Sequence, residues 1–131
     1  RDLLSFPTRR ASDLNEFNDL VAPVEGEPII KKHVNSAFIG TDLQAQLDNA
    51  NITTLVIVGL TTDHCISTTT RMAGNLGYET FLVADATATF NKKGLDGQNY
   101  PAELIHETAL ASLNKEFATI VTTDIIKQSM R

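Results

Sequence analysis

The sequence has little that would tie it to an oxidising compartment or to a membrane. It contains a single cysteine in 131 residues, so no internal disulfide can form and the fold does not depend on one. Its longest apolar run, Leu55–Leu60, has the length of a strand and falls far short of the roughly 20 residues of a membrane-spanning helix. Residues 1–14 lack the apolar stretch and the small-residue cleavage site of a secretory signal peptide. We therefore expect a cytoplasmic protein.

Positive charge is also scarce. Eleven Lys and Arg residues stand against 16 Asp and Glu residues, which gives a formal net charge of −5. The basic residues do not cluster beyond pairs, so neither nucleic acid nor a membrane is expected as a partner. Apolar residues make up 42% and charged residues 21%, which is ordinary for one soluble globular domain with a real core.

The first fourteen residues, RDLLSFPTRRASDL, differ in character from the rest. They hold three of the basic residues, and no strand or helix period continues from them into the following sequence. FPTRRASDL resembles a translated sequencing adapter, which in one frame has Ser in place of Ala11. We therefore expect residues 1–14 to be a non-native leader and residues 15–131 to be a domain that is incomplete at its N-terminus. The alternative is a basic N-terminal arm.

Short apolar runs alternate with segments of helical periodicity along the rest of the chain. The β-branched run Thr53–Val58 is apolar without alternation, which favours a central parallel strand covered by helices on both faces. Alternating strands and helices predict βαβ units with right-handed crossovers. We therefore predict an α/β fold with three αβα layers and a mostly parallel, Rossmann-like sheet. The expected strands are 28–31, 53–58, 79–84 and 117–122. Helices are expected to begin at Thr41 or Asp42, after His64 and at Pro101, and a short helix is expected after the last strand. The glycines of 73–77 should end the second helix, and 91–100 should form a polar loop.

Three places at the ends of strands are candidate sites, because ligands of open α/β sheets bind beyond the carboxyl ends of the strands. They are the turn after Val58, the region of Asp85 and the segment after Ile30. The turn after Val58 reads GLTTDHC and lacks the G-x-G-x-x-G pattern of dinucleotide sites, and the sequence has no P-loop. Cys65 lies at the first turn of the next helix, where backbone N–H groups and the helix dipole favour a thiolate. A small buried hydrophobe is the ordinary alternative for a lone cysteine.

Two blocks of the sequence resemble the isochorismatase-like cysteine hydrolases, a superfamily that includes nicotinamidases and N-carbamoylsarcosine amidases. The first block spans 56–90. It matches the family's pattern of an apolar strand, the motif G-x-x-T-x-x-C-V, a helix with a Thr and a small residue, Gly-Tyr, a second strand and D-A-T. The second block, KHVNSAF at 32–38, matches K-x-x-x-S-A-F. The resemblance covers residues 15–131. The matching positions are Gly59, Thr62, Cys65, Thr69, Ala73, Gly77, Tyr78, Asp85, Ala86 and Thr87, with Ile66 in place of Val, and then Lys32, Ser36, Ala37 and Phe38.

The resemblance implies an Asp–Lys–Cys catalytic triad. Cys65 would be the nucleophile and Lys32 the triad lysine, and the backbone N–H groups of Thr61 and Cys65 would form the oxyanion hole. In the family the peptide before the first of these two residues is cis, which here implies a cis bond between Leu60 and Thr61. The implied reaction cleaves the C–N bond of a small amide or carbamoyl compound. The thiolate attacks, ammonia or an amine leaves, and water hydrolyses the thioester.

The triad aspartate is the part of the resemblance without a match. In the family it follows a first strand in a D-x-Q motif, whereas Asp13 lies in the expected leader and Asp19 follows no apolar run. We therefore expect the first strand to be absent, and we expect a chain without this general acid–base group to have no meaningful amidase activity. Two alternatives stay open: an isochorismatase-type vinyl ether hydrolase, against which the cysteine argues, and a truncated non-catalytic fragment or oligomerisation module.

Neither a metal nor another cofactor is expected. His33, His64 and His106 show no ligand spacing such as H-x-x-x-H, and residues 15–31 do not resemble the Asp/His metal site of nicotinamidases, which disfavours nicotinamide as the substrate. His64 and Phe38 are candidates for lining the pocket, and His106 is expected at the surface or an interface. The expected partners are a small amide or carbamoyl substrate and further copies of the chain in a homo-oligomer.

Overall fold

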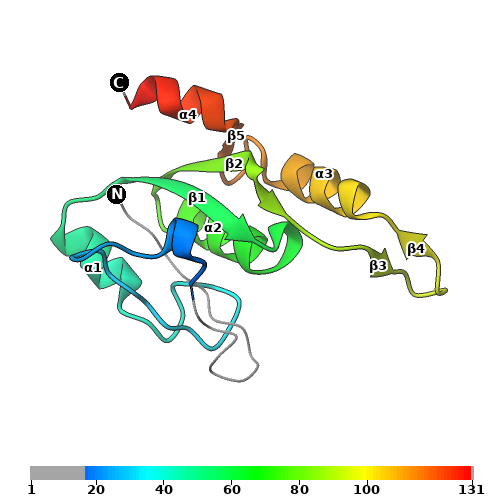
Figure 1. Cartoon of the computed structure of the whole chain (residues 1–131), viewed down its shortest axis with the longest axis horizontal. Helices are drawn as coiled ribbons and strands as arrows, with labels where there is room; N and C mark the ends of the chain where they lie inside the picture. Colours follow the sequence, from blue (N-terminus) through cyan, green and yellow to red (C-terminus); the bar gives the residue numbers. More distant parts are fainter. Residues whose placement is uncertain (1–16, 131) are drawn as a thin grey trace.

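The computed structural model describes residues 17–130, and the leader expected at residues 1–14 lies outside the described residues. The main sheet has three parallel strands in the order β1–β2–β5 (Figure 1). These strands are β1 (Thr54–Leu60), β2 (Glu79–Ala88) and β5 (Thr119–Val121). Helix α2 (Ser67–Asn75) connects β1 to β2, and α3 (Ala102–Leu113) precedes β5.

Shorter elements complete the described chain. A 3-10 turn, η2, precedes α1, and a π-type turn, η3, connects β1 to α2. Two short strands form a hairpin beyond the end of β2, and the last helix follows β5. The bounds are η2 (Asp19–Val21), α1 (Leu43–Asn49), η3 (Thr62–Ile66), β3 (Lys92–Lys93), β4 (Asn99–Tyr100) and α4 (Thr123–Ser129).

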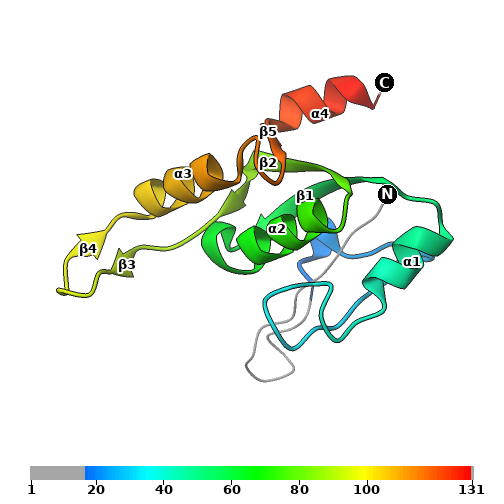
Figure 2. The same cartoon turned by 180° about the vertical axis from the view of Figure 1, so that it is seen from behind.

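Helices pack on both faces of the sheet. Ile57 of β1 and Leu82 of β2 pack with Ala73 of α2 and Leu113 of α3 in the main hydrophobic cluster. Helix α2 lies behind the strands in Figure 1 and in front of them in Figure 2. Residues of α4 and of all three strands line an apolar hollow on the opposite face. The predicted α/β class with a parallel sheet is therefore confirmed.

A second hydrophobic cluster fixes the irregular segment before α1. Ile30 is buried there with Leu43 and Leu47, two residues that lie one turn apart on α1. Phe38 joins this cluster to the main one and stacks on Tyr78, with ring centroids 5.9 Å apart and an interplanar angle of 18°. The packing holds residues 30–38, which include Lys32, against the body of the domain.

The predicted strands need three corrections. The run 53–58 forms β1, but among residues 17–130 β1 pairs with β2 alone and lies at an edge, and β2 is the central strand. Val56 and Val58 of this strand are 46% and 41% exposed. The prediction of a central strand was wrong because an apolar run indicates a preference for burial but does not identify the strands that pair with it. Strand β2 continues to Ala88, beyond the predicted end at Ala84, since its pairing with β1 resumes after a shift in register. Residues 28–31 form no strand, because Ile30 is packed into the second cluster instead.

The segment 91–100 also differs from the prediction. It forms the antiparallel β3–β4 hairpin instead of an irregular polar loop, with Lys92 opposite Tyr100. The hairpin lies beyond α3 at one end of the molecule (Figure 1). Pro101 was expected as the first helical residue, but its extended backbone (φ −67°, ψ 152°) makes it the N-cap of α3.

The two glycines at the end of α2 serve different purposes. Gly77 has a φ of +93° and ends the helix, as predicted. Gly74 lies inside α2, where a Cβ atom would come within 2.7 Å of the carbonyl oxygen of Phe117. The expectation that Gly74 serves helix termination is therefore wrong. This glycine lets α2 approach the backbone that leads into β5.

Candidate active site

The turn after β1 positions Cys65. The Leu60–Thr61 peptide is cis, and η3 begins at the next residue. The carbonyl oxygen of Thr61 accepts hydrogen bonds from the N–H groups of His64 and Ile66, at 3.1 and 3.2 Å. The side chains of Thr62 and Ile66 are fully buried, whereas Cys65 is half-buried. Burial on either side of Cys65 thus anchors the turn and leaves the sulfur partly accessible.

Lys32 reaches this sulfur from a distant part of the sequence. Its Nζ donates to Sγ of Cys65 at 3.2 Å and to the carbonyl oxygen of Val34 at 2.8 Å. The lysine side chain is buried, with 8% exposure. The structure therefore brings together the two side chains that the sequence analysis assigned to the triad, with Nζ of Lys32 at hydrogen-bond distance from the sulfur.

Helix α2 holds the segment that carries Lys32. Thr69 on α2 is buried, and its Oγ1 accepts a hydrogen bond from the N–H of Ala37 at 3.1 Å. The same hydroxyl donates to the carbonyl oxygen of Asn35 at 3.4 Å. Ser36 is buried between these two residues, and its Oγ accepts from the N–H of Phe38 at 3.1 Å. These contacts account for the Thr and the S-A-F residues that the two blocks share with the family.

The remaining predicted site residues lie around the same turn. Thr61 directly precedes η3 and Cys65 lies within it. The role of their N–H groups as oxyanion donors stays a prediction. The side chain of His64 is 58% exposed and its Nε2 lies 2.9 Å from Nζ of Lys92. Phe38 is partly buried because it packs against both hydrophobic clusters. Its expected place in the lining of a substrate pocket also stays a prediction.

Asp63 connects the turn to the residues after β2, a contact that the sequence analysis missed. Its carboxylate lies 2.7 Å from Nζ of Lys92 and accepts a hydrogen bond from Oγ1 of Thr89 at 2.6 Å. Burial raises the pKa of Asp63, but the hydrogen bonds from Lys92 and Thr89 outweigh burial and hold the pKa below its ordinary value. Asp63 therefore stays ionised and attaches the base of the β3–β4 hairpin to the turn that carries Cys65.

Two other sequence candidates serve as links within the fold. The carboxylate of Asp85 accepts from the N–H of Thr123 at 2.8 Å and from its hydroxyl at 2.9 Å. These hydrogen bonds lower the pKa of Asp85 and join β2 to the first turn of α4. His106 was expected at the surface or an interface, but it is half-buried and contacts Thr62 and Ala84, because α3 packs against η3.

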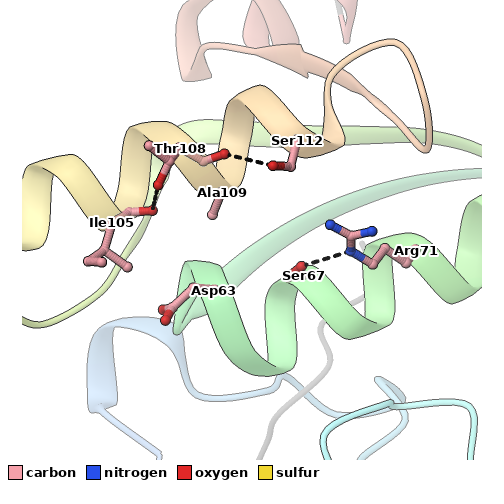
Figure 3. Close-up of a pocket in the computed structure, with 7 residues that line it drawn as sticks. All are labelled: Asp63, Ser67, Arg71, Ile105, Thr108, Ala109 and Ser112. Carbon is pink, nitrogen blue, oxygen red and sulfur yellow. Dashed lines mark hydrogen bonds between the residues drawn. The ribbon is translucent and has the colours of Figure 1, made fainter. Parts of the chain in front are cut away.

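A hollow of about 320 Å³ lies between α2 and α3 (Figure 3). Figure 3 shows Asp63 at its end nearest η3, and Nε of Arg71 donates to Oγ of Ser67 at 3.2 Å across one wall. The apolar hollow under α4 has a volume of about 330 Å³. Neither hollow has Cys65 or Lys32 among its lining residues, so neither is the place where a reacting carbonyl group would meet the sulfur. The first hollow is lined by Asp63, Ser67, Arg71, Ile105, Thr108, Ala109 and Ser112.

Within residues 17–130, no three His, Cys, Asp or Glu side chains come together in a group that could hold a metal ion. None of the helices in this described part of the chain is long and apolar enough to span a membrane.

Sequence comparison identifies the family of this chain. Residues 2–125 match the Isochorismatase domain. The chain belongs to the isochorismatase family. It is 55% identical over 108 residues to the isochorismatase family protein YrdC of Bacillus subtilis, and this alignment covers 82% of this chain and 58% of that protein. It is 29% identical over 118 residues to nicotinamidase 3 of Arabidopsis thaliana, which covers 86% of this chain and 54% of that protein.

A solved structure of the isochorismatase family shares this fold. A protein described as a hydrolase of the family, from Chromobacterium violaceum, superposes with a TM-score of 0.90 and 31% identity, covering 97% of this chain and 69% of that one. The chain spans only 58% and 54% of the lengths of YrdC and nicotinamidase 3. The fold and the family of this chain are thus shown.

Proposed function

We propose that this chain carries the nucleophile and the lysine of a cysteine amidohydrolase that cleaves the C–N bond of a small amide or carbamoyl compound. The observation that supports this most is the 3.2 Å hydrogen bond from Nζ of the buried Lys32 to Sγ of Cys65. A buried ammonium group is costly unless it has a charged or strongly polar partner. The thiolate is the nucleophilic form of a cysteine, and a neighbouring lysine is one of the features that distinguish reactive cysteines from inert ones.

The proposed chemistry follows from these groups. The thiolate of Cys65 attacks the carbonyl carbon, and the C–S bond forms as the carbonyl π electrons move to oxygen. The N–H groups of Thr61 and Cys65 would stabilise this oxyanion; removing one such donor typically lowers the rate about 10²- to 10³-fold. The C–N bond then breaks, the nitrogen takes up a proton and leaves, and water hydrolyses the thioester to the acid. The resemblance assigns the proton transfer to an aspartate that is not matched to any of the described residues.

The relatives are consistent with amide chemistry. Nicotinamidase 3, to which the chain is similar, is named for the hydrolysis of an amide. A cysteine at the position of the nucleophile also favours C–N cleavage over vinyl ether hydrolysis, because a thioester intermediate requires a carbonyl carbon to attack.

Trapping the acyl group tests the proposal. A panel of small primary amides and N-carbamoyl compounds is incubated with the protein and hydroxylamine, which converts a thioester into a hydroxamate. We expect hydroxamate from at least one amide with the wild-type chain and none with Cys65→Ser. Hydroxamate that Cys65→Ser forms at the wild-type rate would contradict the proposal.

A further inference from the structure

His106 of α3 joins the central strand β2 to the turn that carries Cys65. Its Nδ1 lies 2.7 Å from Oγ1 of Thr62, and its Nε2 lies 3.1 Å from the carbonyl oxygen of Ala84. Thr62 is the first residue of η3 and Ala84 lies in β2. One half-buried imidazole ring therefore bridges three elements within three residues of the proposed nucleophile.

The partners of the ring determine where its proton lies. A carbonyl oxygen only accepts hydrogen bonds, so Nε2 carries the hydrogen and donates to Ala84. In the neutral ring Nδ1 then accepts, and the hydroxyl of Thr62 donates to it. Thr62 has no exposed surface, so the His106 ring is the partner of its hydroxyl in place of bulk water.

Thr62 lies between Thr61 and Cys65, whose N–H groups the proposed reaction uses. Thr61 directly precedes it, and the carbonyl oxygen of Thr61 accepts from the N–H groups of His64 and Ile66 on both sides of Cys65. Residues 61–66 are therefore closed into one hydrogen-bonded turn, and a shift of the Thr62 backbone would be transmitted to the neighbouring Thr61 and, through this turn, to Cys65. Oxyanion donors act only if they are held in place before the reaction, and a misplacement of 1 Å can cost about 10²-fold in rate.

We propose that His106 is a positioning residue for acyl transfer at Cys65, and that it acts through the hydroxyl of Thr62. The inference rests on the proposed function, because it assigns the purpose of the contact to the oxyanion donors at Thr61 and Cys65. It also gives a physical reason for a threonine at this point of G-x-x-T-x-x-C: valine has the same shape but no hydroxyl to donate.

Two reactions of the same sulfur separate positioning from general reactivity. With p-nitrophenyl acetate, the Cys65 thiolate attacks the acetyl carbon, the C–S bond forms, the C–O bond breaks, and p-nitrophenolate leaves with the electron pair. This reaction passes through an oxyanion and needs no proton donor for its leaving group. With iodoacetamide the sulfur displaces iodide at a saturated carbon, and no oxyanion forms. A change in the general reactivity of the sulfur acts on both rates, so a change in the ratio of the acylation rate to the alkylation rate of Cys65 reports the stabilisation of the oxyanion.

Paired variants at both residues test the contact. Thr62→Val removes the hydroxyl and Thr62→Ser keeps it. His106→Gln keeps a donor near the position of Nε2, whereas His106→Asn keeps an acceptor near the position of Nδ1. We expect Thr62→Val and His106→Gln to lower the acylation-to-alkylation ratio about tenfold or more, and Thr62→Ser and His106→Asn to stay within about threefold of wild type. Circular dichroism confirms that each variant is folded, and if Thr62→Val does not fold, the His106 pair decides.

The outcomes separate this inference from the proposed function. A wild-type ratio no higher than that of a free thiol such as N-acetylcysteine would overturn both. A raised wild-type ratio that Thr62→Val and His106→Gln leave unchanged would overturn the inference alone. Nitrogen-15 NMR of the His106 ring is the second readout: we expect a protonated Nε2 and an unprotonated Nδ1 whose resonance shifts in Thr62→Val. A proton on Nδ1 of the neutral ring would also overturn the inference.

Discussion

Replacing Lys32 by methionine is expected to slow the reaction of Cys65 with alkylating agents. The buried ammonium group donates to the sulfur at 3.2 Å, and methionine fills a similar volume without the charge. Lys31 provides a matched control, because it is the preceding residue, carries the same charge and is exposed. Lys31→Met should leave the alkylation rate unchanged.

The size of the effect follows from the hydrogen bond that is lost. A hydrogen bond to a charged group contributes about 1.5–3 kcal/mol, which at about 1.4 kcal/mol per tenfold corresponds to a roughly 10- to 140-fold preference for the charged form of such a group. A less stabilised thiolate is a stronger nucleophile, with a Brønsted coefficient of about 0.4–0.5, so only about half of the effect on the logarithmic scale reaches the rate. We therefore expect Lys32→Met to alkylate about 4- to 15-fold more slowly at neutral pH.

Mass spectrometry of Cys65 after timed exposure to iodoacetamide measures this rate. Cys65 is the single cysteine of the chain, so the adduct needs no assignment. Circular dichroism must show that both variants are folded. Equal rates for wild type, Lys31→Met and Lys32→Met would refute the idea that Lys32 activates the sulfur.

Two further predictions concern the packing of α2 and the link to the hairpin. Gly74→Ala should lower the free energy of unfolding, measured by urea titration, by up to about 2 kcal/mol. Alanine gains about 1 kcal/mol of helix propensity over glycine. Its Cβ would lie 2.7 Å from the carbonyl oxygen of Phe117, and such overpacking costs about 1–3 kcal/mol. The lowered pKa of Asp63 means that its contribution to stability is complete above the ordinary value of 3.8 and is lost as the pH falls through the lowered pKa. Lys92→Met should move the titration of Asp63, followed by carboxyl NMR, to higher pH, because burial then acts with less opposition.

Neighbouring residues supply the controls. Asn75→Ala lies in the same helix but is exposed, so it should gain helix propensity without a clash. A Gly74→Ala protein that is as stable as Asn75→Ala would show that α2 and the Phe117 backbone separate at no cost. Lys93→Met removes an exposed charge next to Lys92, and it should leave the titration of Asp63 in place. An equal shift in both lysine variants would indicate a general charge effect in place of the 2.7 Å contact.

The fold class was predictable because it depends on local patterns. The β-branched run at 53–58 and the apolar spacing of the following helix are properties of short windows, and both elements form close to their predicted places. The order of the strands was not predictable in this way. The apolar run of β1 does not report that β2 is the strand with two neighbours. Gly74 was misjudged for the same reason, since its purpose depends on Phe117, which is distant in sequence.

The site was predictable only where a resemblance replaced local pattern. Lys32 and Cys65 are 33 residues apart, and no periodicity connects a lysine in an irregular segment to a cysteine in a turn. The match of KHVNSAF to the family made the pair a hypothesis before the structure brought them together. Lys92 and His106 had no such match. His106 is 44 residues from Thr62, and a search for histidines at metal-ligand spacing does not detect a histidine whose partner is a hydroxyl group.

The most direct test of the central claim is the acyl group itself. The protein is mixed with an amide that yields hydroxamate, quenched in acid within the first turnover, and digested for peptide mass spectrometry. The account predicts that the acyl group of the substrate is bound to Cys65 as a thioester, and that Lys32→Met lowers the initial rate at which this adduct forms while Lys31→Met does not. Release of ammonia with no acyl group on Cys65 at any quench time, and undiminished release by Cys65→Ser, would contradict it.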